Sequence, residues 1–411
     1  MYPKGHRSYT VVTNYASEAS FRRPDTCQLG MFAKLGWPSR NCEYLGERFE
    51  SVILTRSLAS SGSLKRNTKI DIYGGGVSSI AFLVDGKHVV SGGEGGKIRR
   101  WRVADGVEVG TPMEAGSAVY SIAVSRDGKW IVSGTESGLV QVWNAESSEK
   151  VTEFKSPLTN TSVREVDVSP DSTQIASGSS DGTVFVWSLS TWKQLFGPWR
   201  PSTGEDVLAV KFSPDGRLIA TTTKRERGWG GPFVNLRVND SQDGHILAEV
   251  TIETSNFSEQ PLAWSSNSKQ LFALSDDCKI YCLDATTGTT LSQWYVRGNN
   301  ARCIILGNNG AFIAASVGSS VSFWDTTTRK RIGSVIEHST AQVHYINCMA
   351  ISANYDIAIG GGSRITFRTL HGILPSSYVI TFASTLNQTV SLTDAVSTGK
   401  PRNGGWCHIN K

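Results

Sequence analysis

The sequence predicts an all-β protein made of seven copies of one supersecondary unit, and two observations carry that prediction. The first is a set of turn signals whose starts lie 42, 44, 44, 52, 42 and 45 residues apart: Asp85-Gly86, Asp127-Gly128, Asp171-Ser172, Asp215-Gly216, Asn267-Ser268, Asn309-Gly310 and Asn354-Tyr355. The second is the pattern around each turn. A short apolar run precedes it, and a second apolar run, a small-residue turn and a third run follow it.

Residues 163–190 contain one unit in full. Val163 to Val168 alternates in polarity as a strand, Gln174 to Ser177 starts a second strand, and Val184 to Trp187 is a third with period two. A fourth, weaker strand is expected around Gln194 to Gly197. Four short antiparallel strands per unit are the architecture of a propeller blade. The predicted fold is therefore a seven-bladed β-propeller of four-stranded antiparallel blades with irregular N- and C-terminal tails.

Three segments strongly resemble the closing half of a WD40 repeat: Ser91 to Trp101, Ser133 to Trp143 and Ser177 to Trp187. Trp324-Asp325 keeps the dipeptide that gives that family its name, and Val168 to Asp171 and Phe212 to Gly216 look like its first hairpin. The resemblance to WD40-repeat propellers covers residues 70–370. The repeats are also similar to those of the expanded WD40 families of higher fungi.

Aligning the third strands places one residue of each unit at the same blade position: Trp101, Trp143, Trp187, Asn239, Leu283, Trp324 and Arg368. In the family this Trp joins a His, a Ser or Thr and an Asp in a hydrogen-bonded tetrad, and the Asp survives here as Asp181 and Asp277. No unit has the family's Gly-His dipeptide at its expected place. The resemblance therefore implies a propeller less stable than consensus repeats give.

The ends of the chain are assigned from their composition. Residues 1–68 carry ten Lys/Arg and five Asp/Glu without a sustained period, so we expect a basic, mostly disordered segment. Residues 69–370 form the propeller, and residues 371–411 form a Ser/Thr/Asn-rich tail with one β-rich run at 377–382. In the family a strand from the N-terminal side completes the last blade, and we favour Lys69 to Tyr73 over 377–382 for that role.

Charge and cysteine content restrict the classes of function. Of 41 basic and 36 acidic residues, 31 of each sign fall in residues 69–411, so the ring has no basic field for nucleic acid. No apolar run is long enough for a transmembrane helix, and the N-terminus has no signal-peptide core. We expect an intracellular protein, cytoplasmic rather than nuclear, that binds no membrane. Its seven scattered cysteines are then expected to be reduced thiols.

The motifs of catalysis and of cofactor binding are missing. Gly74 to Gly76 and Gly360 to Gly362 lack the Lys-Ser/Thr that a phosphate loop requires, and no Gly-x-Ser-x-Gly nucleophile elbow occurs. The seven histidines are dispersed, and His338 and His344 are interpreted as residues linking units six and seven. We therefore predict no enzyme activity, no cofactor, no metal and no small-molecule substrate.

The spacing of 52 residues marks an insertion in unit four, Thr223 to Phe233, between the second and third strands. It contains Lys224, Arg225, Arg227 and Trp229, and Arg and Trp are enriched at interface hot spots. The resemblance implies that this loop lies on the face formed by the links between blades, a common partner-binding surface. The alternative is a tolerated surface insertion, since loops accept added length at little cost.

The function predicted from these features is a non-catalytic protein–protein interaction scaffold whose propeller rims assemble a complex. The alternative is an adaptor, such as a ubiquitin-ligase substrate receptor or a nuclear RNA-processing component. The Trp-Asp-x-Arg signature of such receptors is absent, because Trp324-Asp325 is followed by Thr326-Thr327. An enzyme on a propeller fold is the third class, and no group of residues in the sequence supports it. The sequence names no particular partner.

Overall fold

The chain divides into two compact units, residues 1–64 and 65–411. The computed structural model describes the following residues: 10–12, 53–55, 67–72, 75–155, 161–200, 205–225, 233–253, 257–275, 277–298, 300–307, 310–338 and 345–379. In the first unit, β1 (Thr10–Val12) pairs antiparallel with β2 (Ile53–Thr55). The expectation of disorder in the rest of the N-terminal segment lies outside the described residues.

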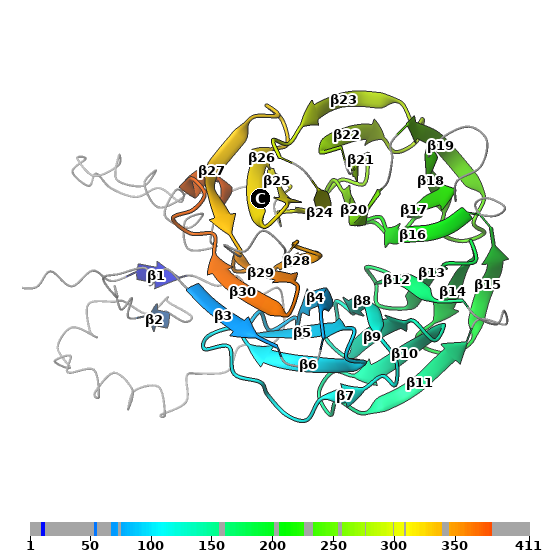
Figure 1. Cartoon of the computed structure of the whole chain (residues 1–411), viewed down its shortest axis with the longest axis horizontal. Coiled ribbons are helices and arrows are strands. Elements are labelled where there is room, and N and C mark those ends of the chain that lie inside the picture. Colours follow the sequence, from blue (N-terminus) through cyan, green and yellow to red (C-terminus); the bar gives the residue numbers. More distant parts are fainter. Residues whose placement is uncertain are drawn as a thin grey trace, which may run out of the picture. The chain divides into compact units, whose positions relative to one another are not determined.

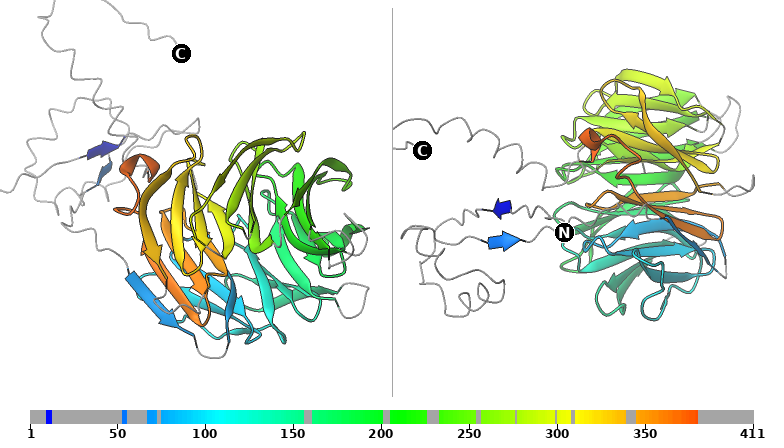
Figure 2. Two further views of the ribbon diagram at one scale, coloured as in Figure 1. Left: turned by 45° about the horizontal axis from the view of Figure 1, so that its top comes forward. Right: turned by 90° about the vertical axis from the view of Figure 1, so that its left-hand side faces the viewer.

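In the second unit the described strands form seven four-stranded antiparallel blades around a ring (Figure 1), which Figure 2 shows from the side. Blade 1 contains, from the centre outward, β4 (Val77–Phe82), β5 (His88–Gly93), β6 (Lys97–Arg102) and β7 (Met113–Glu114). Blade 2 contains β8 (Val119–Val124), β9 (Trp130–Thr135), β10 (Leu139–Asn144) and β11 (Lys150–Lys155). Blades 3 and 4 contain β12 (Val163–Val168), β13 (Gln174–Ser179), β14 (Val184–Ser188), β15 (Gln194–Trp199) and β16 (Glu205–Phe212), β17 (Leu218–Arg225), β18 (Phe233–Asp240), β19 (Ile246–Glu253).

Blades 5 and 6 contain β20 (Phe257–Trp264), β21 (Gln270–Ser275), β22 (Lys279–Asp284), β23 (Thr290–Tyr295) and β24 (Ala301–Leu306), β25 (Phe312–Val317), β26 (Ser320–Asp325), β27 (Arg331–Glu337). Blade 7 contains β28 (Cys348–Ile351), β29 (Asp356–Gly361), β30 (Arg364–Thr369) and, as its outer strand, β3 (Asn67–Asp71). The predicted seven-bladed propeller is thus confirmed. Among the described residues no helix has the length and apolar character needed to cross a membrane.

Burial changes from the second strand of a blade to the fourth in the way the sequence pattern predicts. β9 and β13 bury every residue after the first, because each lies between two strands and between two neighbouring blades. The outer strand β11 is mostly exposed. The turns between first and second strands are fixed by short side chains, as where Asp127 Oδ1 accepts hydrogen bonds from Ser125 Oγ and from the backbone N–H of Lys129.

The ring is closed by the N-terminal strand, as favoured from the sequence. β3 pairs antiparallel with β30 in a register that includes Ile70↔Ile365, and Asp71 Oδ1 lies 2.6 Å from Arg364 Nε. The strand runs from Asn67 to Asp71 and so begins two residues before the predicted Lys69. Its pairing covers the outer edge of β30, which would otherwise be left with unpaired backbone groups.

The β-rich run expected at 377–382 does not begin as a strand. Ser376–Tyr378 is a 3-10 helix, and residues 380–382 lie outside the described residues. The outer edge of blade 7 is already occupied by β3, so the segment packs against blade 6 instead. There the backbone N–H of Ser334 donates to Ile373 O at 3.1 Å, and Tyr378 Oη donates to Asp325 Oδ2 at 2.6 Å.

The inner strands of neighbouring blades are joined by side-chain to backbone hydrogen bonds. Ser79 Oγ accepts from the backbone N–H of Ile122 at 2.8 Å, and Ser121 Oγ accepts from that of Val166 at 3.2 Å. In β12, the inner strand of blade 3, the equivalent position holds Glu165, which is 4% exposed. The seam between blades 3 and 4 therefore contains an ionisable group where the two preceding seams contain hydroxyls.

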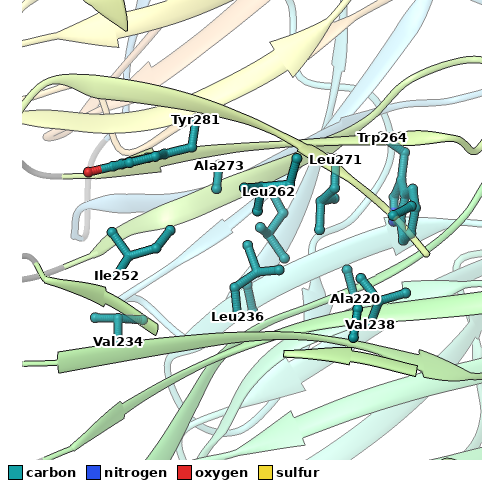
Figure 3. Close-up of a cluster of buried hydrophobic side chains, with 14 residues drawn as sticks. Ala220, Val234, Leu236, Val238, Ile252, Leu262, Trp264, Leu271, Ala273 and Tyr281 are labelled. Carbon is teal, nitrogen blue, oxygen red and sulfur yellow. The ribbon is translucent and has the colours of Figure 1, made fainter. Parts of the chain in front are cut away.

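Apolar side chains fill the space between blades. One such cluster joins blades 4 and 5, where Leu236 and Val238 of β18 lie opposite Leu262 and Leu271 of blade 5 (Figure 3). The described cysteines, Cys278, Cys282, Cys303 and Cys348, are buried, and no disulfide joins them. Cys278 lies in the turn before β22, with φ of 62°, and not on that strand with Cys282.

Candidate functional site

Blade 4 has longer strands than its neighbours, and they lead to the predicted insertion. Each of its strands spans eight residues, whereas those of blade 2 span six. The ladder between β17 and β18 continues through Thr223↔Asn235 and Lys224↔Val234. The insertion lies between the second and third strands as predicted, but residues 223–225 and 233 belong to those strands. Residues 226–232 lie outside the described residues.

A buried polar network lies at the end of blade 4 from which the insertion extends. Glu205 Oε2 accepts from Thr223 Oγ1 at 2.6 Å, and Asn235 Nδ2 donates to both carboxylate oxygens at 3.1 and 3.2 Å. Arg237 donates to Thr223 Oγ1 at 3.2 Å and to Glu249 Oε1 at 2.6 Å. Glu205 is 7% exposed and Arg237 5%. The network joins all four strands of the blade at the base of the insertion.

The opposite face of the same strands is held by apolar packing. Side chains alternate along a strand, so Val234 and Leu236 point away from the polar network. Both are 1% exposed and pack in the cluster that also contains Ile252 of β19 and Tyr281 of blade 5 (Figure 3). The strands that carry the insertion are therefore fixed on both faces, by hydrogen bonds on one and by burial on the other.

The four candidate partner-binding residues fall at the edge of the described structure. Lys224 is half-buried on β17, and its backbone pairs with that of Asp206 on β16. The backbone of Arg225 ends β17 and pairs with that of Glu205. The side chain of Arg225, and Arg227 and Trp229 as a whole, lie outside the described residues. Their role stays a prediction.

In each of the seven blades the aligned third-strand residue pairs with an apolar residue of the second strand. The seven residues therefore occupy equivalent positions. In blades 1 to 3 the tryptophan indole N–H donates to a serine of that strand, at 2.8 to 3.0 Å: Trp101 to Ser91, Trp143 to Ser133 and Trp187 to Ser177. Trp324 differs, since it donates to Ser322 of its own strand at 3.0 Å. Ala315 stands where blades 1 to 3 have serine.

The two aspartates expected in the tetrad accept hydrogen bonds within the turns between the second and third strands of their blades. Asp181 Oδ1 accepts from the backbone N–H of Thr183 at 2.9 Å, and Asp277 accepts from Ser275 Oγ. Both bonds are local caps, in which a short side chain fixes the turn that contains it. Both residues therefore fix turns, and neither bond involves the aligned third-strand residue of its blade, which is Trp187 in blade 3 and Leu283 in blade 5.

His338 has a structural role that the sequence did not reveal. It is fully buried, its Nδ1 lies 2.9 Å from Thr366 Oγ1, and its Nε2 lies 3.3 Å from Gly361 O. It therefore joins the link after blade 6 to the second and third strands of blade 7. The family's Gly-His dipeptide does not identify this histidine, because Glu337 precedes it and the link to the next strand is long.

Comparison with known families agrees with this geometry. The family model described as WD domain, G-beta repeat matches residues 67–102, 108–144 and 148–188, which fall in the closing strand and blades 1 to 3. These repeats lie within the seven-bladed ring. The chain carries WD40 repeats in a β-propeller. No match was found among curated proteins.

In blades 4 and 5 the WD40 tryptophan is replaced, and the second-strand residue that would accept from it changes as well. Blade 4 replaces tryptophan with Asn239, whose Nδ2 donates to Ile219 O at 3.1 Å and lies 3.4 Å from Thr221 Oγ1. Blade 5 has Leu283 at this place and an alanine, Ala273, where the serine would be. In blades 1 to 5 a donor thus remains only where the second strand offers a hydroxyl, and blade 5 has lost both together, which avoids a buried donor without an acceptor. Blades 6 and 7 do not follow this pattern, because Trp324 donates to its own strand and Arg368 Nη1 is buried without a hydrogen-bond partner.

One group of possible metal ligands occurs among the described residues of the WD40 propeller. Ligand atoms of Asp240, Asp243 and His245 lie within 4.8 Å of one another in the turn between β18 and β19. Hydrogen bonds of the turn account for the group, because Asp240 accepts from the N–H of Gln242 and Asp243 accepts from that of His245. Asp243 and His245 are exposed, so nothing in their burial singles them out as a binding site.

Proposed function

We propose that this WD40 propeller is a non-catalytic scaffold for protein–protein interactions and that the blade 4 insertion contacts a partner. The observation that carries the proposal is the buried network around Glu205, which fixes the base of the insertion from all four strands of the blade. Fixing the flanking strands before binding lowers the entropy lost when a partner is bound. A tolerated loop of no function would not need such a base.

The composition of the insertion supports a protein partner. Lys224, Arg225, Arg227 and Trp229 combine side chains of the kinds that dominate hot spots with cations that attract acidic surfaces. Residues 69–411 carry equal numbers of basic and acidic residues, which favours protein over nucleic acid as the partner. WD40 propellers commonly act as such scaffolds, and the partner of this one is to be found by experiment.

The test is affinity purification of the full chain from cells that express it, followed by quantitative mass spectrometry. One variant replaces Glu226 to Pro232 with an Asn-Gly turn, which suits a two-residue hairpin. A second variant carries Arg227→Gln and Trp229→Ala. We expect at least one partner to fall about tenfold in both, which corresponds to about 1.4 kcal/mol of binding free energy.

The matched control neutralises the same kind of charge at the other end of the blades. Lys87→Gln and Lys129→Gln lie in turns between first and second strands, and both variants should keep every partner. Partners that bind equally well to all variants would refute the role of the insertion. A wild-type chain that enriches no protein above an unrelated propeller would refute the scaffold itself.

A further inference from the structure

Blade 1 contains a small cavity at the end where the chain passes from the closing strand into β4. Its volume is about 80 Å³, and its wall includes Ser91, Lys97, Arg99 and five glycines. We call this cavity the blade-1 socket. Two of the glycines, Gly75 and Gly76, belong to the incoming link and offer no side chain to fill it.

The corresponding space in blade 4 is filled by a buried carboxylate. Counting from the aligned third-strand residues Trp101 and Asn239, Arg99 corresponds to Arg237, and Lys97 corresponds to Asn235. In blade 4 the incoming Glu205 accepts from Asn235 Nδ2 at 3.1 and 3.2 Å, and it is joined to Arg237 through Thr223 Oγ1.

Blade 7 fills the same space with a different side chain from its own link. Counting from Arg368 in the same way, Thr366 corresponds to Arg99, and Gly361 corresponds to Gly93 of the socket wall. The incoming His338 contacts both, with its ring nitrogens 2.9 Å from Thr366 Oγ1 and 3.3 Å from Gly361 O. Two blades thus supply a polar side chain from the link, and blade 1 supplies glycines.

We propose that the blade-1 socket binds a carboxylate group that comes from outside the chain. Among the described residues the wall holds the two cations Lys97 and Arg99 and no carboxylate. Arg99 stands where blade 4 has Arg237, which shares the Thr223 hydroxyl with the buried glutamate. A guanidinium group matches the geometry of a carboxylate and binds it with paired hydrogen bonds. Ser91 Oγ, which accepts from Trp101, also carries a hydroxyl hydrogen that a carboxylate can receive.

The carboxylates around the socket do not exclude a further one. Arg99 Nη1 lies 2.9 Å from Glu108, Lys97 Nζ lies 2.8 Å from Glu114, and Glu94 Oε2 accepts from the N–H of Gly76 at 3.0 Å. Blade 4 has a related arrangement, because Arg237 is 2.6 Å from Glu249 of the outer strand while Glu205 lies on the inner side, joined to Arg237 through the Thr223 hydroxyl. An outer glutamate and an inner carboxylate are therefore compatible with one arginine at this position.

The probe for this site is propionate, which is the side chain of glutamate without its backbone, compared with the neutral propionamide. Both are titrated into the isotope-labelled full chain while the backbone amides of Gly75, Gly93 and Gly95 are followed by NMR. We expect saturable shifts with propionate at millimolar concentration and none with propionamide. Equal responses to both, or no saturation by about 100 mM, would overturn the proposal, since so small a ligand binds weakly even in a fitting site.

Variants and a peptide complete the experiment. Arg99→Gln should weaken propionate binding about tenfold, Arg99→Lys should restore part of it, and Lys87→Gln on the opposite rim should leave it unchanged. A variant that binds as the wild type does would contradict the role of Arg99. The blocked peptide Gly-Glu-Gly distinguishes the source, because tighter binding than propionate indicates a protein side chain and exclusion indicates a free carboxylate. Replacing the blade 4 insertion leaves this titration unchanged, so the two proposals fail separately.

Discussion

The free energy of unfolding of the ring should depend on pH because Glu165 is buried in the seam between blades 3 and 4. Replacing Glu165 by glutamine should remove this dependence. The Glu165 carboxylate lies 3.4 Å from Lys211 Nζ, and Asp167 lies 3.8 Å from the same nitrogen. The Glu165 side chain is 5% exposed, and its Oε2 has no hydrogen-bond partner. Burial, with the nearby Asp167 charge, raises the pKa of Glu165 from 4.5 to about 7, although Lys211 opposes the change.

The magnitude and the sign follow from linkage between protonation and folding. A pKa of about 7 in place of 4.5 means that ionising Glu165 costs the folded state about 3 kcal/mol more than the unfolded chain. This contribution to stability is fully present below pH 4.5 and is lost as the pH rises through about 7. Burial raises the pKa of Asp167 too, with Lys211 and Arg126 opposing, so this neighbour acts in the same direction.

The assay is urea unfolding of wild type and Glu165→Gln from pH 4.5 to pH 8. Glutamine imitates the protonated acid, so the two proteins should be equally stable at pH 4.5, and the variant should gain up to about 3 kcal/mol at pH 8. Glu146→Gln, an exposed glutamate in the turn after β10, is the matched control and should follow the wild type. A constant difference between Glu165→Gln and wild type over this range would refute the reasoning.

Three further results are expected. Ser177→Ala should lower the free energy of unfolding by about 1–3 kcal/mol, because the buried Trp187 N–H loses its acceptor, and a loss below about 0.5 kcal/mol would count against this. Gly138→Ala places a Cβ 2.4 Å from a neighbouring carbonyl oxygen at φ of +80°, so its melting temperature should fall more than that of Gly110→Ala, which has φ of +76° and open space. Limited proteolysis should leave a resistant core that starts between residues 65 and 75, whereas protection of residues 1–60 would contradict the expected disordered segment.

Local signals made the blades predictable from the sequence. The turns and the period-two runs each involve a few neighbouring residues, and they repeat often enough to fix the strand order and the equivalence of Trp101, Trp143 and Trp187. The closing strand followed from its alternation and its place before blade 1. The strand expected at 377–382 was wrong at its start because propensity does not indicate whether an edge is still free, and β3 occupies the edge of blade 7.

The polar groups around the candidate site could not be predicted because they depend on contacts between distant residues. Val207 of blade 4 and Ile346 of blade 7 are equivalent residues near the start of the inner strand. Glu205 lies two residues before the first and His338 eight before the second, so no fixed spacing identifies the link residue whose side chain enters the blade. The pKa of Glu165 also depends on distant residues, because burial in the seam between blades raises it and Lys211 of β16 opposes that rise. The sequence showed where the insertion is, and only the folded blade shows what supports it.

The pairing of β3 with β30 has a consequence for synthesis on the ribosome. Asp71 and Arg364, which meet in the closed ring, are 293 residues apart in the chain. At about 5–20 residues per second, β3 waits roughly 15 to 60 s before its partner has been made. During that interval six blades can form in order while β3 has an open edge, so a chaperone that shields a single strand would act at this stage.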